Sequence, residues 1–147
     1  IVFERTTGLL DISANGIPID SVISSQLLEN IFEPNTPLHD GAVIIRGTRI
    51  VSAACVLSLS ESNSISHDLG TRHRAALGIS ESTDAVALIV SEETGIISAA
   101  RAGKLTRHLD AGSLRTLLTD MYQERHSRLW SVLGRLRAKK GGVRHDE

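Results

Sequence analysis

Short apolar runs along the chain predict buried strands. They occupy residues 1–3, 84–90 and 95–100, and a longer run spans residues 42–57. Runs in which nearly every residue is apolar are typical of strands covered on both faces, because a half-exposed strand would alternate apolar and polar residues. The triplet Arg46-Gly47-Thr48 interrupts the longest run and predicts a hairpin turn, and residues 91–94 predict a second turn.

Three helices are predicted between and after these strands. Residues 21–33 have helical spacing, with apolar side chains at Val22, Ile23, Leu27, Leu28, Ile31 and Phe32. Asp20 or Ser21 would cap the start of this helix, and Pro34 would stop it. Thr71 is expected to cap a second helix, and a third helix is expected over about residues 111–124.

The order of these elements favours an α/β fold. Residues 6–20 are expected to form a loop, since Gly8, Gly16 and Pro18 interrupt them. Strands and helices then mix without strict alternation, which predicts a mixed central β-sheet flanked by helices. The length of 147 residues suits one domain with one core. We expect a catalytic domain over 1–124 and a basic tail over 125–147.

Charge is distributed unevenly. Residues 1–124 hold 9 Lys and Arg against 15 Asp and Glu, whereas residues 125–147 hold 7 against 2. An acidic body with few aromatic residues excludes nonspecific nucleic-acid binding and a stacking platform for single strands. The single cysteine, Cys55, lies within an apolar run and is expected to be a small core residue.

The chain has neither a signal peptide nor a run of about 18 apolar residues that would span a membrane. It opens inside an apolar run without a methionine, so we expect a soluble piece of a longer protein. In the tail, Leu129, Trp130, Leu133 and Leu136 have helical spacing among basic residues. Two interpretations stay open: the tail extends the last helix and packs Trp130 on the body, or it lies on an anionic membrane surface.

Three polar clusters stand at predicted strand or helix ends, where binding sites are usually built. They are His39-Asp40-Gly41, Thr71-Arg72-His73-Arg74 and Ser91-Glu92-Glu93. Cations at a helix start are disfavoured by the helix dipole unless an anion neutralises them, so the second cluster suits a polyphosphate. The alternative is that its arginines pair with surface carboxylates such as Asp68 or Glu81.

The carboxylates have similar alternatives. Asp40 could hold a divalent metal or accept a proton from a hydroxyl, or it could be an Asp-Gly turn residue. Glu92 and Glu93 could be a solvated turn. Taken together with a cationic helix start, these carboxylates are the parts of a nucleotide phosphate site. The phosphate-binding and dinucleotide-binding glycine motifs, the serine nucleophile elbow and zinc-ligand spacing are all missing from the sequence.

These clusters identify a family resemblance. The segments NTPLHDGAVII, GTRHRAALGISESTDA and VSEETG occur in this order. They resemble the diadenylate cyclase domain with its DGA and RHR motifs, in particular the membrane-anchored bacterial type called CdaA or DacA. The resemblance covers roughly residues 1–122. It implies the diadenylate cyclase fold and an enzyme that joins two ATP into cyclic di-AMP and two pyrophosphates, with Mg²⁺, Mn²⁺ or Co²⁺.

The resemblance also implies roles for single residues. The DGA motif, at the metal and the attacking 3′-hydroxyl, corresponds to Asp40, Gly41 and Ala42. The phosphate-binding step corresponds to Gly70, Thr71, Arg72, His73 and Arg74, and the turn near phosphate and metal to Ser91, Glu92 and Glu93. His39 is implied as a metal neighbour beside Asp40 and Glu93. Leu57 is implied to lie near adenine, where relatives would have an aromatic residue at the position of Val56.

Partners and location follow from the resemblance and from the product. A product with two-fold symmetry needs two nucleotides that face each other, which predicts a face-to-face pair of identical subunits. Membrane helices of the parent would precede Ile1, at the cytoplasmic face of a bacterial membrane, and would be its only membrane contact. No specific nucleic-acid partner is expected. A nucleotide-binding regulatory module and an interaction domain with a basic tail are the alternative functions.

Overall fold

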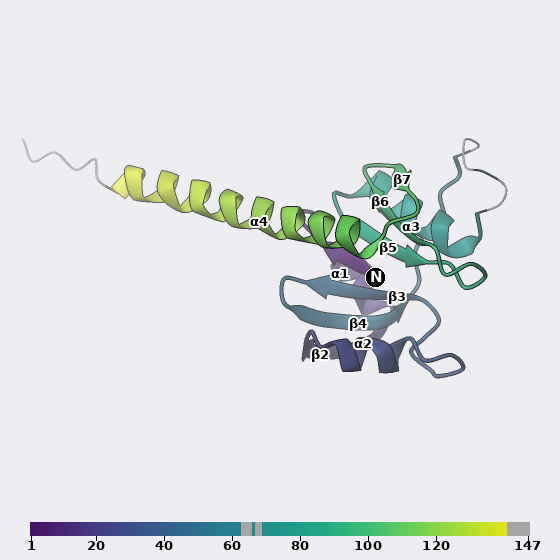
Figure 1. The fold of residues 1–147 in the computed structure, drawn as a ribbon. Helices are drawn as coiled ribbons and strands as arrows, with labels where there is room; N and C mark the ends of the chain where they lie inside the picture. Colours follow the sequence, from purple (N-terminus) through teal and green to yellow (C-terminus); the bar gives the residue numbers. More distant parts are fainter. Residues whose placement is uncertain (63–65, 67–68, 141–147) are drawn as a thin grey trace, which may run out of the picture. The chain divides into compact units, whose positions relative to one another are not determined.

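The computed structural model describes residues 1–62, 66 and 69–140. Contacts divide the chain into two compact units, Ile1–Leu109 and Asp110–Glu147. The first unit holds the sheet and the polar clusters, and the second holds one long helix (Figure 1). None of the helices in the described part is long and apolar enough to cross a bilayer.

The first unit is built on a mixed seven-stranded sheet in its described residues, with strand order β2-β4-β3-β1-β5-β6-β7. In chain order the elements are β1 (Val2–Glu4), α1 (Leu10–Ala14), β2 (Ile17–Val22), α2 (Ser25–Ile31), β3 (Ala42–Arg46), β4 (Arg49–Cys55), α3 (Thr71–Ser82), β5 (Val86–Val90), β6 (Ile97–Arg101) and β7 (Lys104–Thr106). Strand β1 pairs in parallel with β3 and antiparallel with β5. The predicted α/β fold with a mixed sheet is confirmed.

The core lies where the apolar runs predicted it. Val43, Ile44 and Ile45 are all buried although neighbouring side chains point to opposite faces, so both faces of β3 are covered. One core cluster joins this sheet to α1 and α3 through Val2, Leu9, Ile44, Cys55, Ala76, Leu77, Ile79, Ala85, Ala87, Ile89 and Ala100. Both predicted hairpins are present, since β3 pairs with β4 and β5 pairs with β6.

The prediction that residues 6–20 form a loop is wrong in part. It contains α1 and most of β2, an edge strand that pairs with β4. Gly16 and Pro18 made this segment resemble a loop in the sequence, although in the structure each residue fits the packing or the position of the strand. A Cβ on Gly16 would lie 2.4 Å from the Sγ of Cys55, so the glycine allows close approach to β4. Pro18 fits an edge strand, which tolerates a missing N–H.

The first predicted helix is shorter than its apolar pattern. Strand β2 takes residues up to Val22, and α2 begins after Ser24, whose side chain accepts a hydrogen bond from the Leu27 N–H at 3.2 Å. The predicted caps Asp20 and Ser21 therefore belong to the strand. Asp20 instead pairs with Arg49 at 2.8 Å across the β2–β4 ladder. The apolar residues of the strand and of the helix together have the spacing expected for a single helix, so the sequence pattern joined them.

The second unit consists of α4 (Ala111–Lys140) in its described part. Asp110 caps it, because its Oδ1 accepts a hydrogen bond from the Ser113 N–H at 2.7 Å. The helix continues beyond residue 124, the end expected for the third helix, so as far as Lys140 the tail extends this helix, as one of the two interpretations of the tail expected. The functional boundary predicted there, between a catalytic domain and a basic tail, stays a prediction.

Candidate active site

The loop into β3 carries Asp40 and Gly41. Gly41 has a φ of 118°, and a Cβ there would lie 2.7 Å from the carbonyl carbon of Ala54 on β4. Ala54 itself has a φ of 52°, and the β3–β4 register shifts between Ala42 and Ile44, so a bulge lies at this point. Only glycine fits this approach without strain. The bulge and the glycine together turn the chain so that Asp40 stands 88% exposed at the sheet edge.

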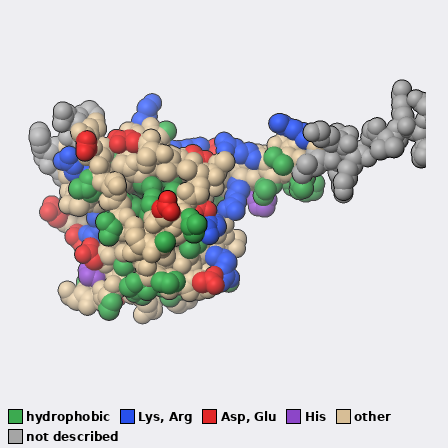
Figure 2. Space-filling view, turned by 180° about the vertical axis from the view of Figure 1, so that it is seen from behind, with side chains coloured by type: hydrophobic (Ala, Val, Ile, Leu, Met, Phe, Trp, Pro, Cys, Tyr) green, Lys and Arg blue, Asp and Glu red, His purple; other side chains and the backbone are tan. Residues whose placement is uncertain are grey.

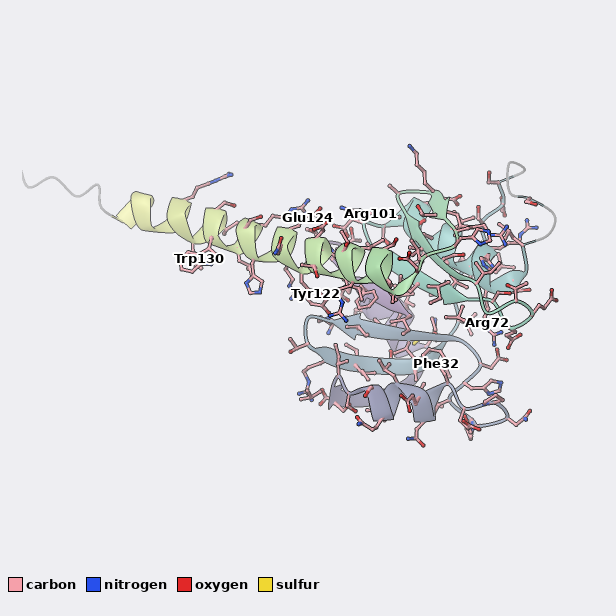
Figure 3. The ribbon with its side chains drawn as sticks, in the orientation of Figure 1. Phe32, Arg72, Arg101, Tyr122, Glu124 and Trp130 are labelled. Carbon is pink, nitrogen blue, oxygen red and sulfur yellow. The ribbon has the colours of Figure 1, made fainter. Side chains whose placement is uncertain are left out.

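Arg72, which belongs to the second predicted cluster, contacts both of the others. Its guanidinium pairs with the carboxylate of Glu92 and lies 3.9 Å from Oδ1 of Asp40. Figure 3 shows Arg72 between the β5–β6 turn and the loop that leads into β3. Residues 20 and 32 positions apart in the sequence thus meet at one edge of the sheet. The alternative that Arg72 pairs with Glu81 is not what the structure shows, and Asp68 lies outside the described residues.

The start of α3 differs by one residue from the predicted start. Gly70 is the N-cap, its carbonyl accepts a hydrogen bond from the Arg74 N–H at 3.2 Å, and no side chain caps the helix. Thr71 is therefore the first helical residue rather than the cap. The first N–H groups of a helix have no partner within it, and the helix dipole is positive there. Uncapped and followed by two arginines, this helix start is suited to an anion.

The three RHR side chains occupy different environments. His73 is only 6% exposed, and its Nε2 has no hydrogen-bond partner within the described residues. Burial and, to a smaller extent, the charge of Arg107 lower the pKa of His73. Arg72 faces the carboxylates, whereas the Arg74 guanidinium donates to the carbonyl of Ser60 at 3.3 Å. The motif therefore contributes one side chain to the exposed edge, one to the interior and one to a neighbouring loop.

The segment after β4 is attached to α3. The Ser60 N–H donates to the Arg74 carbonyl at 2.9 Å, and the Ser60 hydroxyl donates to Glu81 at 2.7 Å. Gly78 makes this crossing possible, since a Cβ there would lie 2.2 Å from the Ser58 carbonyl oxygen. Glu81 thus serves this attachment and does not pair with Arg72 or Arg74 through any contact the structure gives.

The β5–β6 turn presents the third cluster. The Ser91 carbonyl accepts a hydrogen bond from the Gly95 N–H at 2.9 Å, and its hydroxyl accepts one from the Thr94 N–H at 3.3 Å. Glu92 and Glu93 at the tip of the turn are exposed. The hydrogen bond and the charge of Arg72 lower the pKa of the Glu92 carboxyl, and the charge of His39 adds to this effect. The turn is ordered by its own backbone, with Glu92 drawn to Arg72.

His39 completes the edge. Its Nδ1 lies 2.7 Å from the Thr36 carbonyl oxygen, so this nitrogen donates and Nε2 remains for another partner. His39 thus has the geometry of a side chain that could accept a proton or a metal through Nε2. Within the described residues, however, no group of three His, Cys, Asp or Glu side chains is arranged to hold a metal by itself.

One contact beside the site was not expected from the sequence. The side-chain amide of Asn15 donates to the Val56 carbonyl at 3.1 Å and accepts from the Val56 N–H at 2.9 Å. Val56 directly follows Cys55, which pairs with Ala42 of the DGA motif. An Asn-Gly pair reads as a turn in sequence, so only the packing of this turn on β4 reveals the contact.

Comparison with known proteins identifies the family. A profile described as "DisA bacterial checkpoint controller nucleotide-binding" (DAC) matches residues 1–105. The chain belongs to the DAC family. The profile includes Asp40, Arg72 and Glu92, the three residues that meet at the sheet edge. The predicted family resemblance is confirmed.

Relatives of the DAC family are similar over most of this chain. The cyclic di-AMP synthase CdaA of Bacillus subtilis is 50% identical over 97% of the chain and 52% of its own length. A diadenylate cyclase of Listeria monocytogenes is 58% identical over 80% of the chain and 43% of its own length. The chain thus spans about half the length of these relatives.

Solved structures share the fold. A crystal structure of DacA from Staphylococcus aureus, an N166C/T172C double mutant, superposes with a TM-score of 0.81 at 55% identity and covers 82% of this chain and 81% of that one. A hypothetical membrane-spanning protein from Bacillus cereus gives a TM-score of 0.71 at 46% identity, over 74% of this chain and 53% of that one. The sheet therefore belongs to a fold that these proteins share.

Proposed function

We propose that this chain is the catalytic domain of a diadenylate cyclase, which condenses two ATP into cyclic di-AMP and two pyrophosphates. The observation that carries the proposal is the meeting of Asp40, Arg72 and Glu92 at one exposed sheet edge next to an uncapped helix start. Membership of the DAC family and the printed names of the relatives support it.

Arg72 and the start of α3 take the phosphates in this proposal. A triphosphate replaces the carboxylates around Arg72 with better-matched phosphate oxygens, and the free N–H groups at the helix start add neutral donors. Arg74, whose carbonyl and guanidinium both bond to Ser60, contributes a second cation. The predicted phosphate role of His73 stays a prediction. The burial of His73 is expected of a side chain that holds the start of α3 in place.

Asp40 serves the attacking group. Its exposed carboxylate is a suitable acceptor for the proton of a 3′-hydroxyl, and its exposure leaves its oxygens open to a substrate. The 3′-oxygen attacks the α-phosphorus of the second ATP, the bond to the β-phosphate oxygen breaks, and pyrophosphate leaves with the electron pair. Two such attacks, one from each nucleotide, close the ring.

A divalent metal fits the residues present. Magnesium is usually held by one or two carboxylates together with substrate phosphates rather than by a protein cage. The exposed carboxylate of Asp40 and the free Nε2 of His39 suit such a partial site, with Glu93 on the facing turn as a further donor. Mg²⁺, Mn²⁺ or Co²⁺ bound there would neutralise charge that develops on the phosphates.

The reaction requires a second copy of this chain. The edge formed by Asp40, Arg72 and Glu92 binds one ATP, whereas the product contains two equivalent nucleotides. A face-to-face pair related by a two-fold axis satisfies this symmetry. We place the whole protein at the cytoplasmic face of a bacterial membrane. The chain is similar to one protein described as membrane-spanning, and it covers only about half the length of CdaA.

The test is incubation of the chain with ATP and Mn²⁺ followed by mass spectrometry of the products. Cyclic di-AMP and pyrophosphate in a ratio of one to two support the proposal. Bound ATP without product would instead identify a nucleotide-binding regulatory module, and no ATP binding would reject both functions. The rate per subunit should also fall on dilution and on mixing with excess Asp40→Asn chain, because impaired pairs accumulate. A constant rate per wild-type subunit would contradict the paired mechanism.

A further inference from the structure

The residue that follows β4 is exposed and apolar, beside the polar edge. Val56 is 72% exposed, and the residue before it, Cys55, pairs with Ala42, so Val56 stands opposite the Gly41 end of β3. A large exposed apolar side chain next to a phosphate site is suited to one face of a nucleotide base, which is flat and apolar on its faces. Val56 therefore lies next to the start of β3, the strand end that carries Asp40 and Gly41, where a base can pack.

Strand pairing does not continue to Val56. The last pair that β4 makes with β3 is Cys55 with Ala42, and the last that it makes with β2 is Ala53 with Ile17. A strand end without a ladder partner is expected to be mobile, because its N–H and C=O groups would bond to water. Asn15 replaces the missing ladder by bonding both groups of Val56 with its one amide.

The position of Asn15 is itself fixed. Asn15 is the C-cap of α1, and its N–H donates to the Ile12 carbonyl at 3.2 Å. Gly16, the next residue, is packed so closely on Cys55 and Ala53 that a Cβ would lie 2.5 Å from the Ala53 carbonyl oxygen. The turn that carries Asn15 is therefore seated directly on the end of β4.

The contact also determines what remains available to a ligand. With both main-chain groups of Val56 bonded to Asn15, the next residue, Leu57, is held in place by its neighbour and by packing of its side chain on the core cluster. Within the described residues, the main-chain N–H and C=O of Leu57 have no hydrogen-bond partner. A base edge that presents both a donor and an acceptor can bond to such a pair.

We infer that Asn15 is a positioning residue for nucleotide selection: its amide holds Val56 so that the base packs on Val56 and its edge bonds to the main chain of Leu57. The inference rests on the proposed function, since it assumes that the site binds ATP. Asn15 acts on the base alone, because it contacts none of Asp40, Arg72 or Glu92 in the structure. Base binding and phosphate binding are therefore separable by mutation.

The experiment compares three ligands on matched variants of the chain. Isothermal titration calorimetry measures non-hydrolysable ATP and GTP analogues with Mg²⁺ and, separately, inorganic tripolyphosphate with Mg²⁺. The variant is Asn15→Ala. The control is Asn30→Ala, which also removes one exposed amide, bonded to the Gln26 carbonyl at 2.8 Å within α2. Should Asn15→Ala fail to fold, Asn15→Asp keeps the acceptor for the Val56 N–H and serves as the milder variant.

We expect Asn15→Ala to bind the ATP analogue about tenfold more weakly, the scale of one or two lost hydrogen bonds. Tripolyphosphate affinity should be unchanged, preference for the ATP over the GTP analogue should fall, and Asn30→Ala should resemble wild type. Equal ATP-analogue affinity in Asn15→Ala and wild type would overturn the inference alone, and so would equal losses for the ATP analogue and tripolyphosphate. A wild-type chain that binds tripolyphosphate but no ATP analogue would overturn the proposed function and this inference with it.

Discussion

Two arginine–carboxylate contacts in this protein differ in what surrounds them. Arg46 bonds Glu4 through Nε at 2.6 Å and through a second nitrogen at 3.0 Å, and Glu4 is 9% exposed and also accepts from the Leu9 N–H. Arg72 pairs with Glu92, which is 70% exposed, and lies near Asp40, which is more exposed still. The two arginines are similarly exposed, 43% for Arg46 and 39% for Arg72. What differs is the carboxylate: Glu4 is buried, whereas Glu92 and Asp40 face solvent.

The difference indicates two uses of the same chemistry. A contact whose carboxylate is buried is costly to disturb, because the buried group has left water and depends on its partners in the protein. An exposed pair contributes little to stability and can exchange partners. Acidic, basic and hydrophobic side chains are also interspersed across the face of the protein shown in Figure 2, so charge alone does not mark a site. What marks the Arg72 edge is the convergence of three clusters on it.

The largest effect is expected at the exposed edge. Asp40→Asn keeps the size of the side chain but removes its charge, so turnover should fall at least about 100-fold, the usual scale for a lost acid–base or metal role. The unfolding transition should stay close to wild type because Asp40 is exposed. Product formation by liquid chromatography and the midpoint of thermal unfolding test both expectations. Near-normal turnover of Asp40→Asn would exclude an acid–base or metal role for Asp40.

The pair with the buried carboxylate should show the opposite pattern. Glu4→Gln removes the buried anion that accepts hydrogen bonds from Arg46 and from the Leu9 N–H. It should lower the free energy of unfolding by about 2 kcal/mol, the scale of hydrogen bonds to charged groups. Turnover by the remaining folded chain should be unchanged. Urea unfolding and steady-state rates on the same samples measure the two quantities. A variant with wild-type stability but impaired turnover would reverse the comparison between the two pairs.

Arg72 should affect binding more than folding. Arg72→Ala is expected to weaken the ATP analogue about tenfold to 100-fold, since a charge-assisted contact contributes about 1.5–3 kcal/mol. Arg72→Lys should rescue poorly because it lacks the planar fork. Arg74→Ala should also weaken binding, and it should loosen the Ser60 segment as well. Calorimetric titration of all three variants is the measurement, and affinities equal to wild type would exclude a phosphate role for both arginines.

The smallest effect concerns pH. Burial lowers the pKa of His73 below its unfolded value, so the unfolded chain binds the proton more readily. The neutral His73 therefore contributes its full share of stability above about pH 6.5, and that share declines as pH falls from there towards the lower folded pKa. Urea unfolding of wild type and His73→Gln between pH 5 and 7.5 should show a shallower slope in the variant. Equal slopes of the unfolding free energy against pH in wild type and variant would mean that a group other than His73 causes the pH dependence.

The sequence by itself determined the apolar strands, both hairpins and the three polar clusters, because these are local patterns of burial and turn chemistry. It also carried the family motifs. It misplaced the helix that was predicted to begin at residue 21, since strand β2 and α2 share one apolar spacing, and it hid β2 behind Gly16 and Pro18. Local propensity could not show that Gly16 is required by its contact with β4 rather than by a loop.

Only the tertiary structure decided which charges meet. Arg72 had Asp68 and Glu81 nearby in sequence, yet sheet order places it with Glu92 and Asp40. In the same way His73, part of one motif with two arginines, is turned into the interior, and Asn15 is joined to Val56 across 41 positions. Contacts of this kind depend on which strands are neighbours, and strand order is set by burial summed over the whole sheet rather than by any one segment.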